Sequence, residues 1–372
     1  MEFAVVQTIL IYSLLTLFMY YCARKASLYN MFSYMVVGLL VYSIVMGLRY
    51  GVGTDFFSYQ NMYDSSLNGF EVEKEPGFVA IIKFATTLGF SNSFCLFTYA
   101  FVQLFLIFKA FSGYKQIFPF MVITFMLSEE WLMYANVIRH MIAFAIFVYA
   151  LKFIINRNLI KYLLSIACAC LFHKSAAVLV VIYPIYLFRP SFFNNRAIQF
   201  ILLGGSLVMM NLNFIQEFIA YFDKLIALLG YGDKYLLDDR MDMEVSIGLG
   251  FLVELCIALT IIFFSPKVKQ YYNSSLLNIS YDLFFIGVLI KYSFIGSMLI
   301  QRMNLFFLGF TFIVAAFTMT YLFKTKKLMK YAILCMYLLF FTGVMMSMKE
   351  NTALYVFNFQ EQFYHYKYDI MK

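Results

Sequence analysis

The chain has 372 residues, of which 63% are hydrophobic and only 13% are charged, and its formal net charge is +8. A mean hydropathy of +0.80 argues against a soluble enzyme. Apolar runs of spanning length recur from end to end, which predicts an all-α polytopic membrane protein. Because no long soluble segment interrupts them, we expect a single integral membrane domain over residues 1–372.

The first apolar run, residues 3–21, has no basic flank before it and no small-residue cleavage site after it. It is therefore predicted to be a span and not a cleaved signal peptide. About twelve spans are expected in all, at residues 3–21, 31–47, 93–109, 117–133, 136–155, 159–172, 175–188, 197–212, 246–264, 280–300, 303–323 and 331–348. Two of them, 159–172 and 175–188, are short for a bilayer about 30 Å thick and indicate partial or tilted helices.

The charged residues divide into two sets of alternating loops. One set is rich in Lys and Arg and almost free of Asp and Glu, and the other set is acidic. The positive-inside rule places the basic loops in the cytoplasm. Both chain ends and two longer loops, about 48–92 and 213–245, are then external, and these loops are predicted to carry short amphipathic helices. The positive net charge thus has a topological cause and does not indicate nucleic-acid binding.

No segment has the spacing of a metal or nucleotide site. The six cysteines lie in or beside apolar segments and show no metal-ligand spacing. The pair Gly51-x-Gly53 lacks the third glycine, the preceding strand and the following helix of a dinucleotide fingerprint. We therefore expect no metal and no cofactor, and we expect these glycines to let the chain turn sharply.

Ionisable residues at membrane depth identify a candidate site, because each is costly in lipid. Arg49 lies at the outer end of the second predicted span, and Arg139 lies one turn inside the fifth. His173 lies at the outer junction of the sixth and seventh spans, and Arg302 lies at the outer start of the eleventh. The predicted topology places all four at one depth, just below the external surface, with Asp55 a few residues beyond Arg49.

Three arginines and a histidine at one level suit an anionic ligand. Arginine binds phosphate oxygens through a bidentate fork and stays charged at any relevant pH. His173 can protonate or act as an acid or base, and Asp55 can take a proton from a hydroxyl nucleophile. The alternative is that each arginine extends to the interface beside polar neighbours. For the set as a whole, we favour ligand binding.

Other polar residues have structural explanations. Glu254 and Lys291 lie near the middle of consecutive predicted spans and are expected to form an ion pair and not a proton relay. His140 points about 100° away from its neighbour around the helix and is expected to be a packing histidine. The loop 213–245, which contains Arg240, is either a carbohydrate-facing lid or a plain interfacial helix.

Three segments resemble signatures of one family. Residues 47–56 (GLRYGVGTDF) followed by Tyr59, with residues 75–78 (EPGF), resemble the opening signature of the EpsG/Wzy-like polysaccharide polymerases. Residues 137–143 (VIRHMIA) resemble the second block of that family, with His140 where Gln is more usual, and residues 171–176 (LFHKSA) resemble the third. The second half of the chain is similar in its pattern of spans and at Gln301-Arg302.

The resemblance implies a GT-C-like membrane glycosyltransferase of the bacterial inner membrane with its active site facing the periplasm. Such an enzyme polymerises O-antigen or a related polysaccharide by moving a growing glycan from one undecaprenyl pyrophosphate carrier to the repeat unit on another. Its partners would be that lipid-linked oligosaccharide, the bilayer and a chain-length regulator protein, and no nucleotide sugar is needed. The alternatives are a flippase for lipid-linked oligosaccharide, an O-antigen ligase, and an assembly partner without a site.

The resemblance and the charge pattern together give the candidate residues their roles. The candidates for catalysis are Asp55, His173 and Arg139. The candidates for binding the pyrophosphate and the glycan are Arg49, Arg139, Arg302, Tyr59 and Arg240. A flippase would instead predict charges along a central path and internal repeats, and the sequence shows neither pattern.

Overall fold

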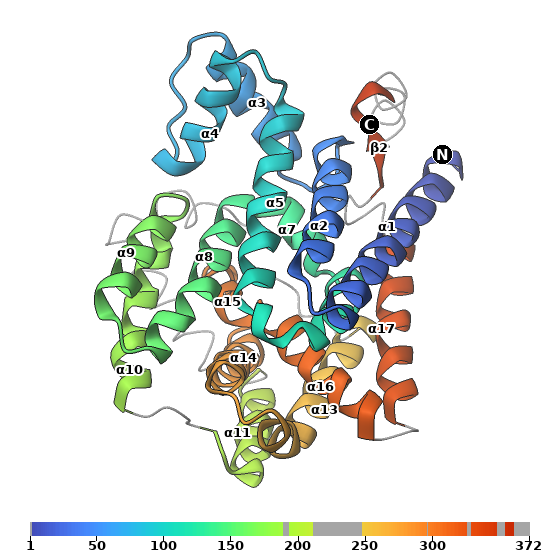
Figure 1. Cartoon of the computed structure of the whole chain (residues 1–372), viewed down its shortest axis with the longest axis vertical. Helices are drawn as coiled ribbons and strands as arrows, with labels where there is room; N and C mark the ends of the chain where they lie inside the picture. The colour runs from blue at the N-terminus through green and yellow to red at the C-terminus, as the bar shows by residue number, and fades with distance from the viewer. Residues whose placement is uncertain are drawn as a thin grey trace. The chain divides into compact units, whose positions relative to one another are not determined.

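The computed structural model describes residues 2–188, 193–210, 248–295, 297–325, 329–347 and 354–360, and this part of the chain is mainly helical (Figure 1). The chain divides into two compact units. The first unit is Met1–Phe188 with Lys327–Lys372, and the second is Arg189–Lys326. The single membrane domain expected over residues 1–372 stays a prediction.

The first unit is built mainly from helices that pack side by side. Its α-helices are α1 (Glu2–Leu28), α2 (Phe32–Gly47), α3 (Phe56–Leu67), α4 (Pro76–Thr87), α5 (Asn92–Ala110), α6 (Phe118–Met126), α7 (Glu130–Asn136), α8 (Ile138–Ile155), α9 (Leu159–Cys170), α10 (Ile182–Phe188) and α17 (Met329–Met346). Its other described elements are the 3-10 helices η1 (Ser112–Ile117), η2 (Lys174–Val181) and η5 (Asn358–Gln360) and the strands β1 (Arg49–Tyr50) and β2 (Val356–Phe357). Helices α9, α8, α5, α2 and α1 pack in that order, and α6 packs on α1 (Figure 1).

Seven described helices are long and apolar enough to cross a bilayer, and an eighth span results if Ser112–Met126 and Glu130–Asn136 count as one bent pair. The described residues therefore do not confirm the expected twelve spans. The predicted spans at 31–47, 159–172 and 197–212 are apolar helices of only 10–17 residues. Hydropathy detects an apolar run, but it does not show where the backbone breaks, and here several runs are shorter than a span.

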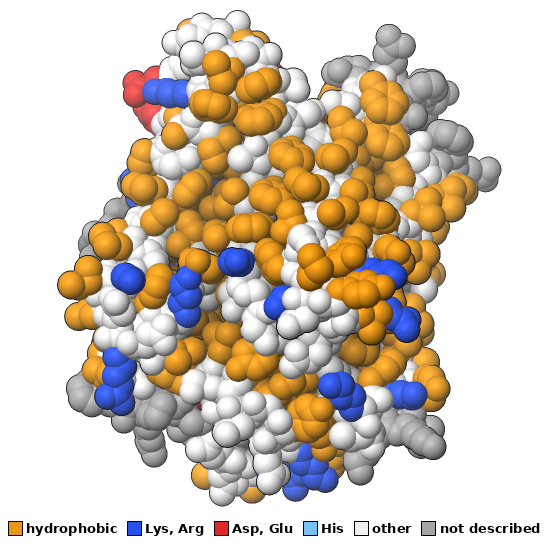
Figure 2. All heavy atoms as spheres, in the orientation of Figure 1, with side chains coloured by type: hydrophobic (Ala, Val, Ile, Leu, Met, Phe, Trp, Pro, Cys, Tyr) orange, Lys and Arg blue, Asp and Glu red, His pale blue; other side chains and the backbone are white. Residues whose placement is uncertain are grey.

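The surface of the described helices is largely apolar. Figure 2 shows hydrophobic side chains over most of the visible face, interrupted mainly by Lys and Arg. On α1, Leu10, Leu14 and Leu17 are each more than half exposed. A contiguous apolar surface of this kind is expected where helices contact lipid. The protein is therefore a polytopic α-helical membrane protein.

The segment that contains β2 ties several elements of the first unit together at one end. β2 pairs antiparallel with β1. The backbone N–H of Tyr355 donates to Thr8 Oγ1 (2.8 Å), and its hydroxyl donates to the Val45 carbonyl (2.6 Å). The backbone N–H of Asn358 donates to the Leu48 carbonyl (2.9 Å). We call this region, where α1 begins and α2 ends, the β1–β2 end of the first unit.

Three lysines in the last turns of helices lie far from the β1–β2 end. Helix α5 begins at that end, because Asn358 Nδ2 donates to Ser93 Oγ (2.8 Å). Helices α1, α5 and α8 carry Lys25, Lys109 and Lys152 in their last turns. The acidic loop between α2 and α5 lies at the opposite ends of α1 and α5 from these lysines. The charge separation predicted from the loops is thus present within the first unit.

The second unit is organised around α14. Its described helices are α11 (Arg196–Met209), α13 (Leu249–Tyr272), α14 (Ser275–Ser293), α15 (Met298–Leu308) and α16 (Thr311–Thr325). Helix α14 contacts each of the other four. The ion pair expected between Glu254 of α13 and Lys291 of α14 is present. Gln301 Nε2 donates to the Lys291 carbonyl (2.9 Å), which links the same part of α14 to α15.

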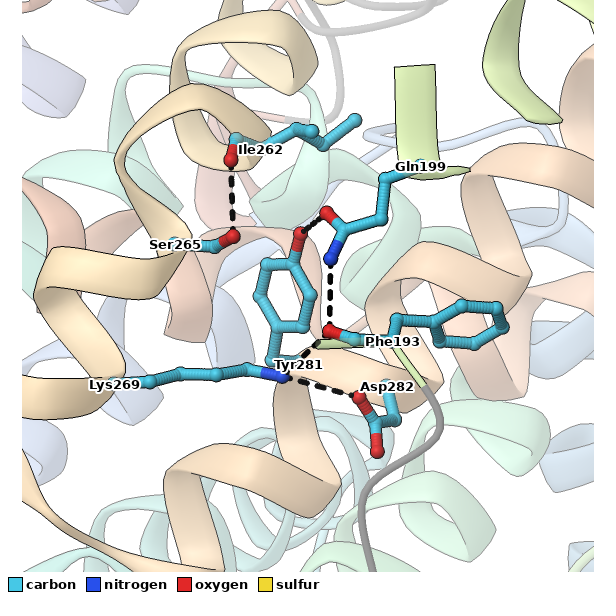
Figure 3. A network of polar contacts seen from close by, with 7 residues as sticks. All are labelled: Phe193, Gln199, Ile262, Ser265, Lys269, Tyr281 and Asp282. Carbon is cyan, nitrogen blue, oxygen red and sulfur yellow. Dashed lines mark hydrogen bonds and ion pairs between the residues drawn. The ribbon is translucent and has the colours of Figure 1, made fainter. Parts of the chain in front are cut away.

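A second polar network joins α11, α13 and α14 (Figure 3). Lys269 Nζ lies 3.3 Å from Asp282 Oδ1 and donates to the Phe193 carbonyl (3.2 Å). The Tyr281 hydroxyl donates to Gln199 Oε1, and Gln199 Nε2 donates to the same Phe193 carbonyl (2.8 Å). Gln199 and Asp282 are both buried, so these partners satisfy groups that would otherwise be costly.

Tyr281→Phe is expected to destabilise the second unit by about 1–3 kcal/mol, because it leaves the buried Gln199 amide oxygen without this donor. Thermal unfolding of the purified protein in detergent measures the effect. Tyr271→Phe is the matched control, since Tyr271 is half-exposed. Equal unfolding temperatures for the two variants would contradict a structural role for this network.

Candidate active site

A buried carboxylate at the β1–β2 end joins residues from three elements. Glu75, which directly precedes α4, forms an ion pair with Arg139 in the first turn of α8. Glu75 Oε1 also lies 3.6 Å from Nδ1 of His173, which directly precedes η2. The side chain of Glu75 is only 9% exposed, whereas those of Arg139 and His173 are 26% and 28% exposed. The carboxylate therefore holds two side chains that remain partly accessible to a ligand.

Residues 76 and 77 determine how Glu75 reaches this position. Pro76 is the first residue of α4, where a fixed φ favours helix initiation. The Gly77 N–H donates to the Leu171 carbonyl (2.8 Å). A Cβ at Gly77 would lie 2.9 Å from that oxygen and 3.0 Å from Leu171 Cβ. The absence of a side chain lets the start of α4 contact the end of α9, which brings Glu75 next to His173.

The surroundings of Glu75 keep it ionised. Burial alone raises the pKa of its carboxyl group, but the neighbouring His173 ring and the charge of Arg139 outweigh burial and lower the pKa from 4.5 to about 2. At neutral pH Glu75 is therefore a hydrogen-bond acceptor that orients Arg139 and His173.

The stabilising effect of Glu75 should depend on pH. Its folded-state pKa of about 2 lies below the ordinary value of 4.5. The contribution of Glu75 to stability is therefore complete above the ordinary value of 4.5 and is lost as the pH falls toward about 2. We expect the difference in unfolding temperature between the wild type and Glu75→Gln to be larger at about pH 7 than at about pH 3. Glu73→Gln, on an exposed residue of the same loop, is the control. A Glu75→Gln difference that is constant over this range would contradict the assignment.

Arg49 is held inside the same end of the unit. It is only 2% exposed, and its Nη1 and Nη2 donate to the carbonyls of Met46 (2.8 Å) and Ala135 (3.0 Å). Its Nε has no hydrogen-bond partner among the described residues. Arg49 thus links the end of α2 to α7, and within the described part of the chain it forms no ion pair.

Asn136 positions the loop that carries Asp55. Asn136 Oδ1 accepts hydrogen bonds from Thr54 Oγ1 and from the Asp55 N–H, both at 2.9 Å. The Asn136 carbonyl accepts from the Tyr59 hydroxyl (2.8 Å), which in turn accepts from the Ile138 N–H (3.2 Å). The half-buried Asp55 therefore lies beside the start of α8, the helix that carries Arg139.

Tyr59 lies among the charged candidates of this unit. Its side chain is buried, and burial followed by the charge of Asp55 raises the pKa of its hydroxyl to about 12, although Arg139 and Arg49 act in the opposite direction. Tyr59 stays neutral at any relevant pH and connects α3 to the α7–α8 junction. The predicted contact between Tyr59 and substrate stays a prediction.

Sequence reasoning missed two residues of this site. Glu75 was counted only with the acidic loop, although it stands in the EPGF signature, and no pattern indicated Asn136. His140 was expected to be a packing residue, and it is indeed buried. Its ring nevertheless lies 4.8 Å, centroid to centroid, from the ring of His173. The buried imidazole therefore forms part of the immediate surroundings of His173.

Two residues predicted to bind substrate lie outside the part of the first unit that the structure describes. Arg302 belongs to α15 of the second unit. Arg240 lies, with the loop 213–245, outside the described residues. In the part of the chain that the structure describes, no group of three or more His, Cys, Asp or Glu side chains has metal-binding geometry.

The comparisons identify the family of this chain. No curated protein and no solved structure matches it. The model of the EpsG family matches residues 31–368, which include every segment that builds the candidate site. Since the match covers nearly the whole sequence, the chain belongs to the EpsG family.

Proposed function

We propose that this protein is a GT-C-like polysaccharide polymerase of the bacterial inner membrane, which extends a lipid-linked O-antigen or related glycan at the periplasmic face. The observation that supports this most strongly is the cluster of Glu75, Arg139 and His173. The cluster lies at the β1–β2 end, and the lysines of α1 and α5 lie at the opposite ends of those helices. By the positive-inside rule, the β1–β2 end is external. Membership of the EpsG family supports a polymerase-like role.

The proposed reaction is glycosyl transfer between two lipid-linked substrates. A hydroxyl oxygen of the acceptor sugar attacks the anomeric carbon of the donor glycan and forms the new glycosidic bond. The bond from that carbon to undecaprenyl pyrophosphate breaks, and its electron pair leaves with the pyrophosphate. The hydroxyl proton passes to a base on the protein. Negative charge therefore develops on the leaving pyrophosphate, where fixed cationic donors lower the barrier most.

Arg139 has the properties required of such a donor. Glu75 holds its guanidinium through one Nη atom, and the side chain remains partly exposed. Its Nε has no hydrogen-bond partner among the described residues. A guanidinium can bind a carboxylate and a phosphate at once, because it has five N–H groups. The charge of Arg49 raises the local positive potential, and phosphate contacts by Arg302 and Arg240 stay predictions.

Two groups are candidates for the base. His173 Nδ1 lies 3.6 Å from Glu75 Oε1, and this buried carboxylate orients the imidazole ring. Asp55 is half-buried beside the start of α8, and its carboxylate can accept a proton from a hydroxyl group. Glu75 itself is committed to Arg139, so we assign it to positioning. The transfer rates of His173→Gln and Asp55→Asn separate the two, since only the substitution of the base removes the proton acceptor.

A reconstituted assay tests the proposal. Purified protein in proteoliposomes is given undecaprenyl pyrophosphate-linked repeat units, and the lipid-linked products are separated by length. Longer lipid-linked glycan is the expected product. Repeat units that cross the bilayer without extension would identify a flippase. Transfer to lipid A core, which is added as an acceptor in a parallel sample, would identify a ligase. Either result would overturn the proposal.

A further inference from the structure

A cavity of about 490 Å³ lies at the β1–β2 end of the first unit. Its walls come from β1, from α3, from the start of α5, and from Asn358 and Phe359 of η5. This volume falls in the range of about 300–1,000 Å³ that is usual for small-molecule sites. Four segments that are distant in sequence thus line an open, ligand-sized space within one unit.

The cavity and the Glu75 cluster are formed by different residues. Tyr59 is directed at Asn136 and the start of α8, which carries Arg139. Gln60 and Asp64, one turn apart on another face of α3, line the cavity. None of Glu75, Arg139 and His173 lines it. The cavity is therefore a separate space next to the candidate active site.

The polar groups in the cavity form an ordered series. Asn92 Nδ2 donates to Gln60 Oε1 (2.6 Å), and Gln60 Nε2 donates to Asp64 Oδ1 (3.0 Å). Each amide uses one of its two N–H groups in these bonds, and Asp64 uses one of its two oxygens. The second N–H of each amide and the second oxygen of Asp64 leave hydrogen-bonding capacity, and neighbouring hydroxyl groups of a sugar ring both donate and accept such bonds. The arrangement is fixed before any ligand arrives, which lowers the entropic cost of binding.

The charge and the aromatic lining also favour a sugar. Arg49 and Asp64 contribute one positive and one negative charge, so the wall is balanced and does not specifically favour a pyrophosphate. The ring of Phe359 is 73% exposed, yet it stacks on Phe357 with centroids 4.9 Å apart. A rigid, exposed aromatic face can pack against the C–H face of a sugar ring, as it packs against other apolar groups.

We propose that this cavity is a glycan subsite, which binds sugars of a lipid-linked repeat unit through Gln60, Asn92, Asp64 and Phe359. The inference rests on the proposed function, because a polymerase must hold two glycans while it joins them. The subsite supplies binding to the sugar portion of one substrate, and the Glu75 cluster supplies the chemistry.

Direct binding tests the subsite without requiring catalysis. The probe is the repeat-unit oligosaccharide released from its pyrophosphate carrier by mild acid, and its affinity for the purified full-length protein is measured by calorimetry. Gln60→Ala and Phe359→Ala should each weaken binding about tenfold, the effect expected from losing one or two good contacts. The matched control is Asn61→Ala, since Asn61 is exposed on α3 and does not line the cavity.

The outcomes separate the subsite from the proposed reaction. Failure of the wild type to bind the free oligosaccharide, or equal affinities for Gln60→Ala and Asn61→Ala, overturns the subsite even if the wild type polymerises. Failure of the proposed function appears instead as a wild type that never lengthens lipid-linked glycan. Because Phe359 is on the surface, Phe359→Ala should keep the wild-type unfolding temperature, so weaker binding by this variant reports the loss of the ring.

Discussion

Arg139→Gln is expected to lower the rate of glycan polymerisation at least about 100-fold, which is the usual effect of removing a donor that stabilises charge in the transition state. The reconstituted assay measures the rate directly, with the protein amount checked in the same vesicles. Arg157→Gln is the matched control, because Arg157 is an exposed arginine beyond the far end of the same helix. It should polymerise at the wild-type rate.

A double variant separates catalysis from folding. Arg139→Gln alone leaves the buried Glu75 carboxylate without its guanidinium partner, which is a destabilising change. Adding Glu75→Gln removes that charge, so the double variant should recover part of the lost unfolding temperature and none of the lost rate. If activity returns together with stability, Arg139 has a structural role only.

Gly77→Ala is expected to have the second-largest effect. The new Cβ would lie 2.9 Å from the Leu171 carbonyl oxygen, a backbone atom that cannot move without moving the end of α9. Overpacking of this kind costs about 1–3 kcal/mol, and the displaced start of α4 separates Glu75 from His173. We expect both a lower unfolding temperature in detergent and a loss of most polymerase activity.

The control for this change is Gly113→Ala. A Cβ at Gly113 would meet no atom within 4 Å, so the substitution should leave stability and activity unchanged. A Gly77→Ala protein that behaves like Gly113→Ala would show that the contact between α4 and α9 is not needed. Intermediate stability with full activity would show that the position of Glu75 tolerates the shift.

Helix positions could be predicted where one helix fills an apolar run. The runs 93–109 and 136–155 correspond to Asn92–Ala110 and Ile138–Ile155. The run 117–133 was expected to be one span, but its helices are bent by 71° at a short break. Hydropathy does not detect such bends, because the residues on both sides of the break are apolar. The number of spans was for this reason the weakest part of the fold prediction.

The candidate site could be predicted only in part. Because the predicted spans alternate in direction across the membrane, Arg139 and His173 are expected at one depth. In the structure, Glu75 contacts both of them. Glu75 itself was not expected, because its position depends on a tertiary contact between Gly77 and Leu171 that no local pattern encodes. Asn136 was missed for the same reason, since its bonds run to a loop far away in the sequence.

The pairing of β2 with β1 has a consequence for biogenesis. Tyr355 bonds Val45 across 310 positions of sequence, and α17 directly precedes this segment among the described helices. During translation, the ribosome and the insertion machinery must therefore deliver α17 before the strand pair can form. Until then the edge of β1 and one wall of the cavity remain open. A nascent chain thus completes the β1–β2 end of the first unit only after α17 has been inserted into the membrane.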